Sequence, residues 1–143
     1  MERIRLRFLL DTAPWINAVT MPQVLPERIR RWLDTDEVKG LCTVSLLEAA
    51  ILYRLGRMAL QGTLPQFFEA ALASNLQLLE LTPAIAAKTN ELSVGFHGDP
   101  FDRTIVATAA TMNLTLITAD PAIRDAAMCS VEYYPFKPSR ASA

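Results

Sequence analysis

Four acidic residues in this chain occupy the same kind of position along the sequence. Each lies just after an apolar run, or in the first turn of the helical pattern that follows one: Asp11, Glu48, Asp102 and Asp120. In a parallel α/β sheet, such positions converge outside the carboxyl ends of the strands. Carboxylate oxygens are the ligands that hard divalent cations prefer, and a cation held in this way commonly serves phosphodiester chemistry. The pattern therefore predicts a divalent-metal site that acts on phosphate esters.

The segments that would position these acids alternate between strand-like and helix-like patterns. Apolar runs predict strands at residues 4–10, 40–44, 76–81 and 114–118, and a shorter run at 131–134 is a fifth candidate. Apolar periodicity and helix-start residues predict helices at 27–34, 45–55, 64–74, 83–94 and 100–112, with short helices near Pro14 and Pro121. Strands that alternate with helices predict a parallel sheet covered by helices on both faces.

Helix capping is a simpler explanation for two of the four acids. Ser45 and Glu48 fit the S-x-x-E capping box, in which both side chains satisfy backbone amides at a helix start. Asp120, directly before Pro121, fits a helix N-cap. Taken singly, Glu48 and Asp120 are explained by capping at least as well as by catalysis.

Asp11 and Asp102 fit the capping explanation less well. Asp11 directly follows three apolar residues, although an ordinary turn residue at a strand end is an alternative. Asp102 follows Asp99 and Pro100, which already supply an N-cap and a first helical residue. The two explanations are also compatible, because the positive end of a helix keeps nearby carboxylates ionised, as a cation requires.

The composition indicates one globular domain without a general nucleic-acid-binding charge. The chain has 143 residues, 51% of them hydrophobic, and 14 basic against 15 acidic residues. Any contact with RNA would then have to be local. Cys42 and Cys129 lack metal-type spacing and are expected to be free thiols in a cytoplasmic protein. The N-terminal apolar run is too short, and too interrupted by arginine, for a signal peptide or a membrane span.

Two further side chains near Asp102 could take part in chemistry. His97 is the only histidine, and it is either an acid–base group or a hydrogen-bonding turn residue. Arg103 could orient a carboxylate or a phosphate, or it could face solvent at the helix start.

The order and spacing of these segments resemble the PIN domain, specifically toxin ribonucleases of the VapC type. The matching segments span almost the whole chain: Phe8-Leu-Leu-Asp11-Thr12, Ser45-Leu-Leu-Glu48, His97-Gly-Asp-Pro-Phe-Asp102-Arg103 with an alanine-rich helix after it, and Leu116-Ile-Thr118-Ala-Asp120. Each segment is a weak signal alone, and the full series is strong.

The resemblance implies a three-layer α/β/α fold with a central, mostly parallel sheet of four or five strands. It implies a single PIN domain over residues 1–135, followed by a flexible tail at 136–143. Mg²⁺ or Mn²⁺ would be held by the four acids, with Asp11 and Asp102 as the foremost direct ligands and Asp99 as a secondary candidate. Three further side chains would support those ligands without contacting the cation. They are the hydroxyls of Ser45 and Thr118, which would orient carboxylates, and the guanidinium of Arg103. A homodimer and a small antitoxin of the VapB type are the implied partners, beside an RNA substrate.

The implied activity is endonucleolytic hydrolysis of RNA by a metal-activated water, with Glu48 or Asp120 as proton acceptor. The sequence contains no Ser/His/Asp arrangement and no glycine-rich phosphate loop that would suggest another nucleophile. One alternative is a non-enzymatic interaction domain whose acids cap helices. Another is a phospho-accepting signalling domain, which normally needs a lysine at its site.

The chain departs from the family pattern at two positions near the acids. Relatives often carry a histidine where this chain has Ala13, and many carry a lysine where it has Leu52. Arg54 offers a positive charge from a shifted position. These differences concern contacts with the substrate and RNA preference more than metal binding.

Overall fold

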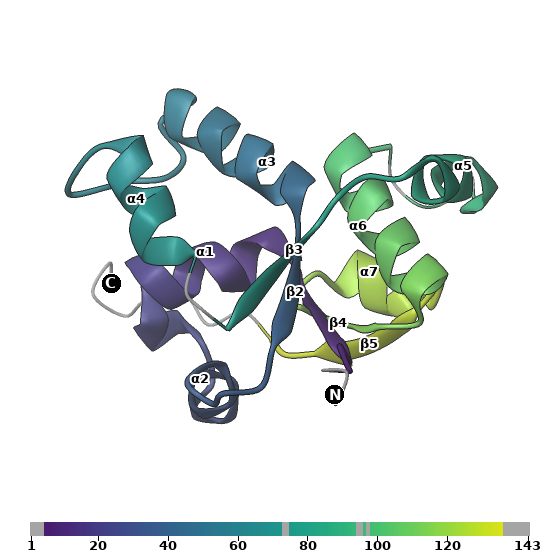
Figure 1. The fold of residues 1–143 in the computed structure, drawn as a ribbon, viewed down its shortest axis with the longest axis horizontal. Coiled ribbons are helices and arrows are strands. Elements are labelled where there is room, and N and C mark those ends of the chain that lie inside the picture. Colours follow the sequence, from purple (N-terminus) through teal and green to yellow (C-terminus); the bar gives the residue numbers. More distant parts are fainter. Residues whose placement is uncertain (1–4, 73–74, 94–95, 97, 136–143) are drawn as a thin grey trace.

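Five parallel strands form the centre of the molecule (Figure 1). The structure is a computed structural model that describes residues 5–72, 75–93, 96 and 98–135. In chain order the strands are β1 (Phe8–Leu10), β2 (Lys39–Cys42), β3 (Leu76–Leu79), β4 (Thr115–Thr118) and β5 (Ser130–Tyr133). Their order across the sheet is β3-β2-β1-β4-β5, so the chain builds outward from β1 in both directions.

Helices cover both faces of this sheet, which confirms the three-layer α/β/α prediction. They are α1 (Thr12–Thr20), the 3₁₀ turn η1 (Pro22–Val24), α2 (Glu27–Leu33), α3 (Thr43–Arg54), α4 (Leu64–Ala71), α5 (Pro83–Glu91), α6 (Pro100–Met112) and α7 (Pro121–Ala126). Buried side chains of α5, α6 and α7 pack on one face, and those of α1 to α4 pack on the other. Side chains of successive strand residues alternate between these two cores, since Leu9 belongs to the first and Leu10 to the second.

Most helix starts follow the signals in the sequence, and one does not. Proline occupies the first turn of α4, α5, α6 and α7, where its missing amide costs no hydrogen bond. The predicted helix 45–55 instead begins two residues earlier, at Thr43, and Cys42 at its N-cap makes no side-chain cap. Gly56, at φ 73°, follows the end of α3, because glycine adopts this left-handed conformation without strain.

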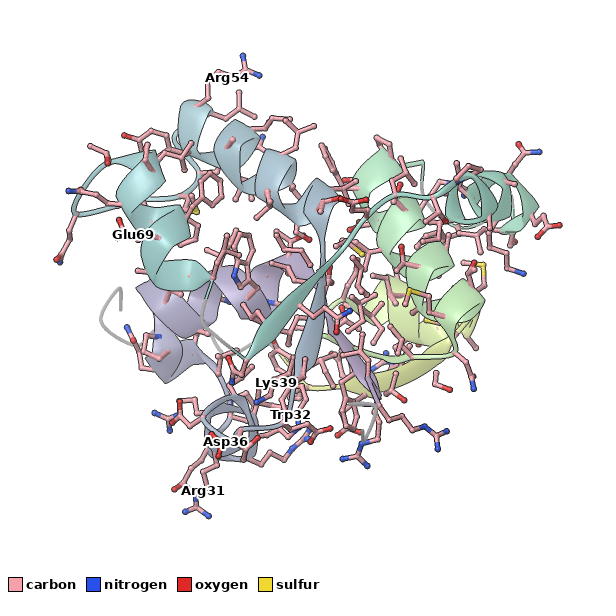
Figure 2. All side chains as sticks on the ribbon, in the orientation of Figure 1. Arg31, Trp32, Asp36, Lys39, Arg54 and Glu69 are labelled. Carbon is pink, nitrogen blue, oxygen red and sulfur yellow. The ribbon has the colours of Figure 1, made fainter. Side chains whose placement is uncertain are left out.

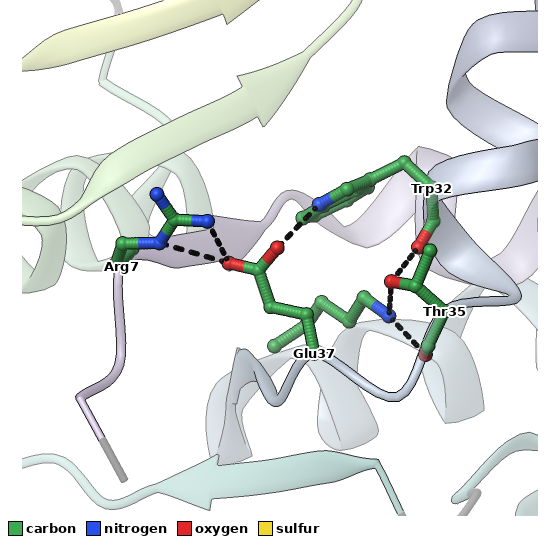
Figure 3. A network of polar contacts seen from close by, with 5 residues as sticks. Arg7, Trp32, Thr35 and Glu37 are labelled. Atoms are coloured by element: carbon green, nitrogen blue, oxygen red, sulfur yellow. Dashed lines mark hydrogen bonds and ion pairs between the residues drawn. The ribbon is translucent and has the colours of Figure 1, made fainter.

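The opposite edge of the sheet, where the strands begin, is fixed by a polar network (Figure 3). The Arg7 guanidinium donates to Glu37 Oε2 at 2.9 and 3.1 Å, and Trp32 Nε1 donates to Glu37 Oε1 at 3.2 Å. Lys39 is 1% exposed, and its ammonium donates to the Thr35 carbonyl at 2.8 Å and hydroxyl at 3.1 Å. These contacts fix the connection between α2 and β2, and therefore the position at which β2 begins.

Some predictions fall on parts of the chain outside this description. The predicted flexible tail at 136–143 and the position of His97 lie outside the described residues. Within the described part of the chain, no helix has the length and apolarity to span a bilayer.

Candidate active site at the carboxyl edge of the sheet

Asp11 lies where β1 ends and α1 begins, and it is 7% exposed. Its Oδ1 accepts a hydrogen bond from the Thr12 amide at 2.8 Å, so Asp11 is the N-cap of α1. Capping, which the sequence favoured less for Asp11 than for Glu48 and Asp120, is thus one role of Asp11. Its Oδ2 accepts a bond from Thr118 Oγ1 at 2.7 Å, which joins the ends of two adjacent strands, β1 and β4.

Glu48 is positioned by α3 and does not belong to a capping box. Because α3 begins at Thr43, Ser45 already lies inside the helix, and Glu48 lies beyond its first turn. Ser45 is fully buried, and its hydroxyl lies 2.8 Å from the Thr12 hydroxyl, which links α3 to α1. Ser45 of the S-x-x-E segment thus joins two helices and does not cap α3. Glu48 Oε1 is buried, and among the described residues it has no hydrogen-bond partner.

The start of α6 brings two further acids to the same edge. Asp99 is the N-cap of α6, as predicted, and its Oδ1 accepts from the amides of Phe101 at 2.8 Å and Asp102 at 3.3 Å. Asp102 lies in the first turn of the helix and is partly buried. Its convergence with the other acids, which the strand–helix order permitted without requiring, is confirmed.

Three of these carboxylates lie close enough to share a cation. One oxygen each from Glu48, Asp99 and Asp102 all lie within 4.8 Å of one another. A group of three carboxylates, one with a buried and unpartnered oxygen, suits a hard divalent cation, since such a cation takes oxygen ligands and offsets their repulsion. Asp99, which the family resemblance implied only as a secondary candidate ligand, belongs to this group.

Burial, and to a lesser extent the charges of neighbouring acids, raises the pKa of three of these carboxylates. Burial, together with the charges of Asp11, Asp99, Glu48 and Asp120, raises the pKa of Asp102 to about 8. Burial also raises the pKa of Glu48, although the Thr12 side chain opposes that rise. The pKa of Asp11 is raised by burial as well, against the hydrogen bonds from Thr118 and Thr12. Without a cation, this edge of the sheet therefore retains protons near neutral pH.

Asp120 lies at the same edge of the sheet, two residues after the end of β4. It is the N-cap of α7, as predicted, with Oδ1 accepting from the Ala122 amide at 2.9 Å. Its own amide donates to Thr118 Oγ1 at 3.0 Å, so one hydroxyl contacts both Asp120 and Asp11. Asp11 and Asp120 lie outside the group of three, but their charges raise the pKa of Asp102.

This chain is similar to known proteins of one family. The PIN domain family matches residues 8–128 of the chain. Ribonuclease VapC22 of Mycobacterium tuberculosis is 30% identical over 118 residues, which cover 81% of this chain and 88% of that protein. The chain belongs to the PIN domain family. Within this family, it is of the VapC type.

Solved structures show the same fold at lower sequence identity. The structure of FitAcB from Neisseria gonorrhoeae has a TM-score of 0.64 at 27% identity and covers 90% of this chain and 97% of its own. VapBC2 from Rickettsia felis, solved bound to a DNA fragment from its promoter, has a TM-score of 0.68 at 16% identity, with 90% and 98% covered. At the lower identity the likeness concerns the fold of the PIN domain.

The described hydrogen bonds of Arg103 in this PIN domain go to partners other than the predicted carboxylate or phosphate. Its guanidinium donates to the backbone carbonyls of Thr89 at 2.8 Å, Leu92 at 3.2 Å, Phe96 at 3.3 Å and Ser93 at 3.4 Å. These carbonyls lie at and after the end of α5, where a cation is favourable. Arg103 therefore fastens α5 to α6, and none of its described hydrogen bonds is to a carboxylate.

One polar side chain at the site was not predicted from the sequence, and another has a different partner from the one predicted. Thr12 follows the first acid, is 4% exposed and contacts Ser45, yet only its place beside Asp11 in the sequence hinted at this role. Ser45 was expected to orient a carboxylate directly, and its described hydrogen bond is instead to Thr12. Cys42 is a buried free thiol as expected and Cys129 is partly buried, and desolvation raises the pKa of each to about 11.

Proposed function

We propose that this PIN-domain protein is a Mg²⁺- or Mn²⁺-dependent endoribonuclease and the toxin of a toxin–antitoxin pair. The observation that carries the proposal is the approach of Glu48, Asp99 and Asp102 within 4.8 Å beside Asp11 and Thr118. Membership of the PIN family and similarity to a protein named as a VapC ribonuclease support the choice of RNA as substrate. Residues 1–135 would form the single catalytic domain.

Glu48, Asp99 and Asp102 would hold the cation, with Asp11 completing the site from β1. A bound divalent cation supplies an acidified water and neutralises charge on the attacked phosphate. The hydroxyl of Thr118 holds Asp11 in place from behind, and the contact between Thr12 and Ser45 fixes the distance between α1 and α3. Glu48 and Asp120 are the two candidate proton acceptors, since both carboxylates lie at this edge of the sheet.

The proposed partners follow from the relatives. Among the solved structures that resemble this chain are VapBC complexes, so we propose a small VapB-type antitoxin as protein partner and a homodimer as the working assembly in the cytoplasm. The alternative, a PIN-like interaction domain whose acids only cap helices, is favoured by the caps at Asp11, Asp99 and Asp120. It does not explain the buried, unpartnered oxygen of Glu48.

Replacement of Asp11 by asparagine tests the proposal. We expect Asp11→Asn to abolish Mg²⁺-dependent cleavage of single-stranded RNA, a loss of at least about 10²-fold, because the side chain loses the charge that the cation needs. EDTA should abolish cleavage by the unchanged protein. The matched control is Asp36→Asn, an exposed acid at the opposite edge of the sheet (Figure 2).

The interaction-domain alternative predicts a different result. In that case neither EDTA nor Asp11→Asn would change any RNA-directed activity, and calorimetry would detect no Mg²⁺ binding. Circular dichroism of Asp11→Asn separates lost chemistry from lost folding, since the asparagine amide oxygen can still accept the Thr12 hydrogen bond.

A further inference from the structure

A groove of about 790 Å³ lies between α1, the end of α3, the segment 57–63 and the start of α4. Its volume falls within the range of small-molecule and cofactor sites, about 300–1,000 Å³. In Figure 1 these elements lie on the side of the molecule away from α5 and α6.

One end of this groove reaches the acidic edge. Ala13, one of its lining residues, is two positions after Asp11 in the first turn of α1. Leu52, another lining residue, is four positions after Glu48 on α3, and residues four apart lie on the same face of a helix. A chain bound along the groove would therefore arrive between Asp11 and Glu48.

The groove carries one positive charge and none that is negative among its described lining residues. That charge is Arg57, which is exposed and takes no part in the ion pairs described for this chain. Arg54, to which the sequence pointed as a substitute cation, lies elsewhere: Figure 2 shows it at the outer end of α3, directed away from the body of the molecule. Arg57 is thus the cation that faces whatever occupies the groove.

The walls of the groove combine apolar surface with amide groups. Val19 and Met21, which are 40% and 38% exposed, supply its accessible apolar surface, and Ile16, Met58 and Phe67 line it as buried side chains. Asn17 and Gln61 add amides, each with donors and an acceptor. Apolar faces that pack on bases, amides that bind base edges and a guanidinium that binds phosphate are together the chemistry of single-stranded RNA recognition.

We propose that this groove binds the single-stranded RNA next to the scissile phosphate, and that Arg57 contacts a phosphate of that flanking strand. The inference rests on the proposed ribonuclease function and adds the site that would select the substrate. A cation here is needed because the five acids at the edge of the sheet repel the RNA backbone. The other class of occupant, an apolar segment of a protein partner, would use the walls but would not require the guanidinium or the amides.

Binding of RNA without cleavage tests this site directly. In the full-length Asp11→Asn protein with Mg²⁺ present, affinity for a labelled single-stranded RNA of mixed sequence is measured by fluorescence anisotropy over a range of salt. We expect Arg57→Ala to weaken binding by about tenfold or more at low salt, the effect of one lost charged hydrogen bond. The slope of log affinity against log salt should become smaller by about 0.7, the value for one phosphate contact on a single strand.

Arg54→Ala is the matched control, since it removes the same charge three residues away, outside the groove. It should change affinity by less than about twofold, the screened effect of a distant surface charge. Equal losses in the two variants would overturn the proposal, because Arg57 would then act only through general charge. Unchanged affinity in Arg57→Ala would overturn it as well.

A second variant adds a charge to the same wall. Leu52→Lys should strengthen RNA binding and increase the salt slope by about 0.7, reversing the effect of Arg57→Ala. Cleavage by the protein with Asp11 intact distinguishes failure of the groove assignment from failure of the ribonuclease assignment. If that protein cleaves RNA and neither groove variant changes binding, this inference fails and the ribonuclease assignment stands. If it cleaves no RNA, the ribonuclease assignment itself fails.

Discussion

At the scale of single residues, helix capping and metal binding are compatible roles for the same carboxylate. Asp11, Asp99 and Asp120 each accept a backbone amide at a helix start. A carboxylate has two oxygens with about four acceptor positions, so one capping bond leaves capacity for a cation. Capping also fixes the side chain before any cation arrives, which reduces the entropy lost on binding.

Among the described carboxylates, Asp102 is the one whose pKa is raised by the greatest number of acidic neighbours. Burial and four neighbouring carboxylates raise its pKa to about 8, so its ionised form destabilises the metal-free protein. We expect Asp102→Asn to raise the melting temperature in EDTA at pH 8 by at least about 2 °C, the shift that roughly 1 kcal/mol produces in a domain of this size. The same change should weaken Mg²⁺ binding by about tenfold or more, because one direct ligand loses its charge. Scanning calorimetry and a metal titration measure the two effects.

Asp36→Asn is again the control, since Asp36 is exposed and lies at the opposite edge of the sheet. It should leave both the melting temperature in EDTA and the Mg²⁺ affinity unchanged within error. A lower melting temperature for Asp102→Asn would contradict the view that this carboxylate is destabilising without a cation.

At the scale of secondary-structure elements, the local signals in the sequence predicted most of the fold. Apolar runs predicted all five strands, and prolines marked the first turns of α4 to α7. The strand at 4–10 was predicted too long, since β1 begins at Phe8. The order of strands across the sheet could not be predicted, because β1 and β4 pair over about a hundred intervening residues with no local signal.

The site was less predictable where its residues depend on contacts between elements. The S-x-x-E segment matches a capping box by type and spacing, yet α3 begins earlier because Thr43 and Val44 continue directly from β2 into the helix. Its buried Ser45 then contacts Thr12 of α1, which no local pattern encodes. The carbonyl contacts of Arg103 likewise depend on how α5 packs against α6.

One hydroxyl joins the Asp11 side chain to the end of β4, in addition to the backbone pairing of β1 with β4. Thr118 Oγ1 donates to Asp11 Oδ2 at 2.7 Å and accepts from the Asp120 amide at 3.0 Å. Thr118→Val keeps the shape and removes both hydrogen bonds, which should destabilise the protein by about 1–3 kcal/mol. Loss of the contact that orients Asp11 should also weaken Mg²⁺ binding by about tenfold. Urea denaturation and a metal titration measure these changes.

Thr108→Val is the matched control for that substitution. Thr108 is also buried, and its hydroxyl donates to the Thr104 carbonyl within α6. Its removal should cost less stability, about 1 kcal/mol, because that carbonyl belongs to the helical ladder. Mg²⁺ affinity should not change. Equal losses of Mg²⁺ affinity in the two variants would contradict a specific role for Thr118.

At the scale of the whole molecule, charge is balanced overall and concentrated locally. The net charge is −1, yet five carboxylates meet at one edge of the sheet. The ion pairs Arg7–Glu37, Arg28–Glu132 and Arg31–Glu27 join exposed side chains on other parts of the surface. The fold therefore gathers five carboxylates in one region, and a divalent cation relieves their repulsion there.

This arrangement predicts that the stability of the metal-free protein falls as pH rises. The pKa values of Asp11, Glu48 and Asp102 are raised on folding, to about 8 for Asp102, from unfolded values near 4. Between these limits the folded state holds more protons than the unfolded state, so raising the pH favours unfolding. In EDTA, the melting temperature should therefore be higher at about pH 5 than at about pH 8.

Mg²⁺ should raise the melting temperature more at pH 8, where the acids are ionised and bind the cation, than at pH 5. In Asp102→Asn both pH dependences should be weaker, and a stability in EDTA that rises from pH 5 to pH 8 would contradict the electrostatic account of this site.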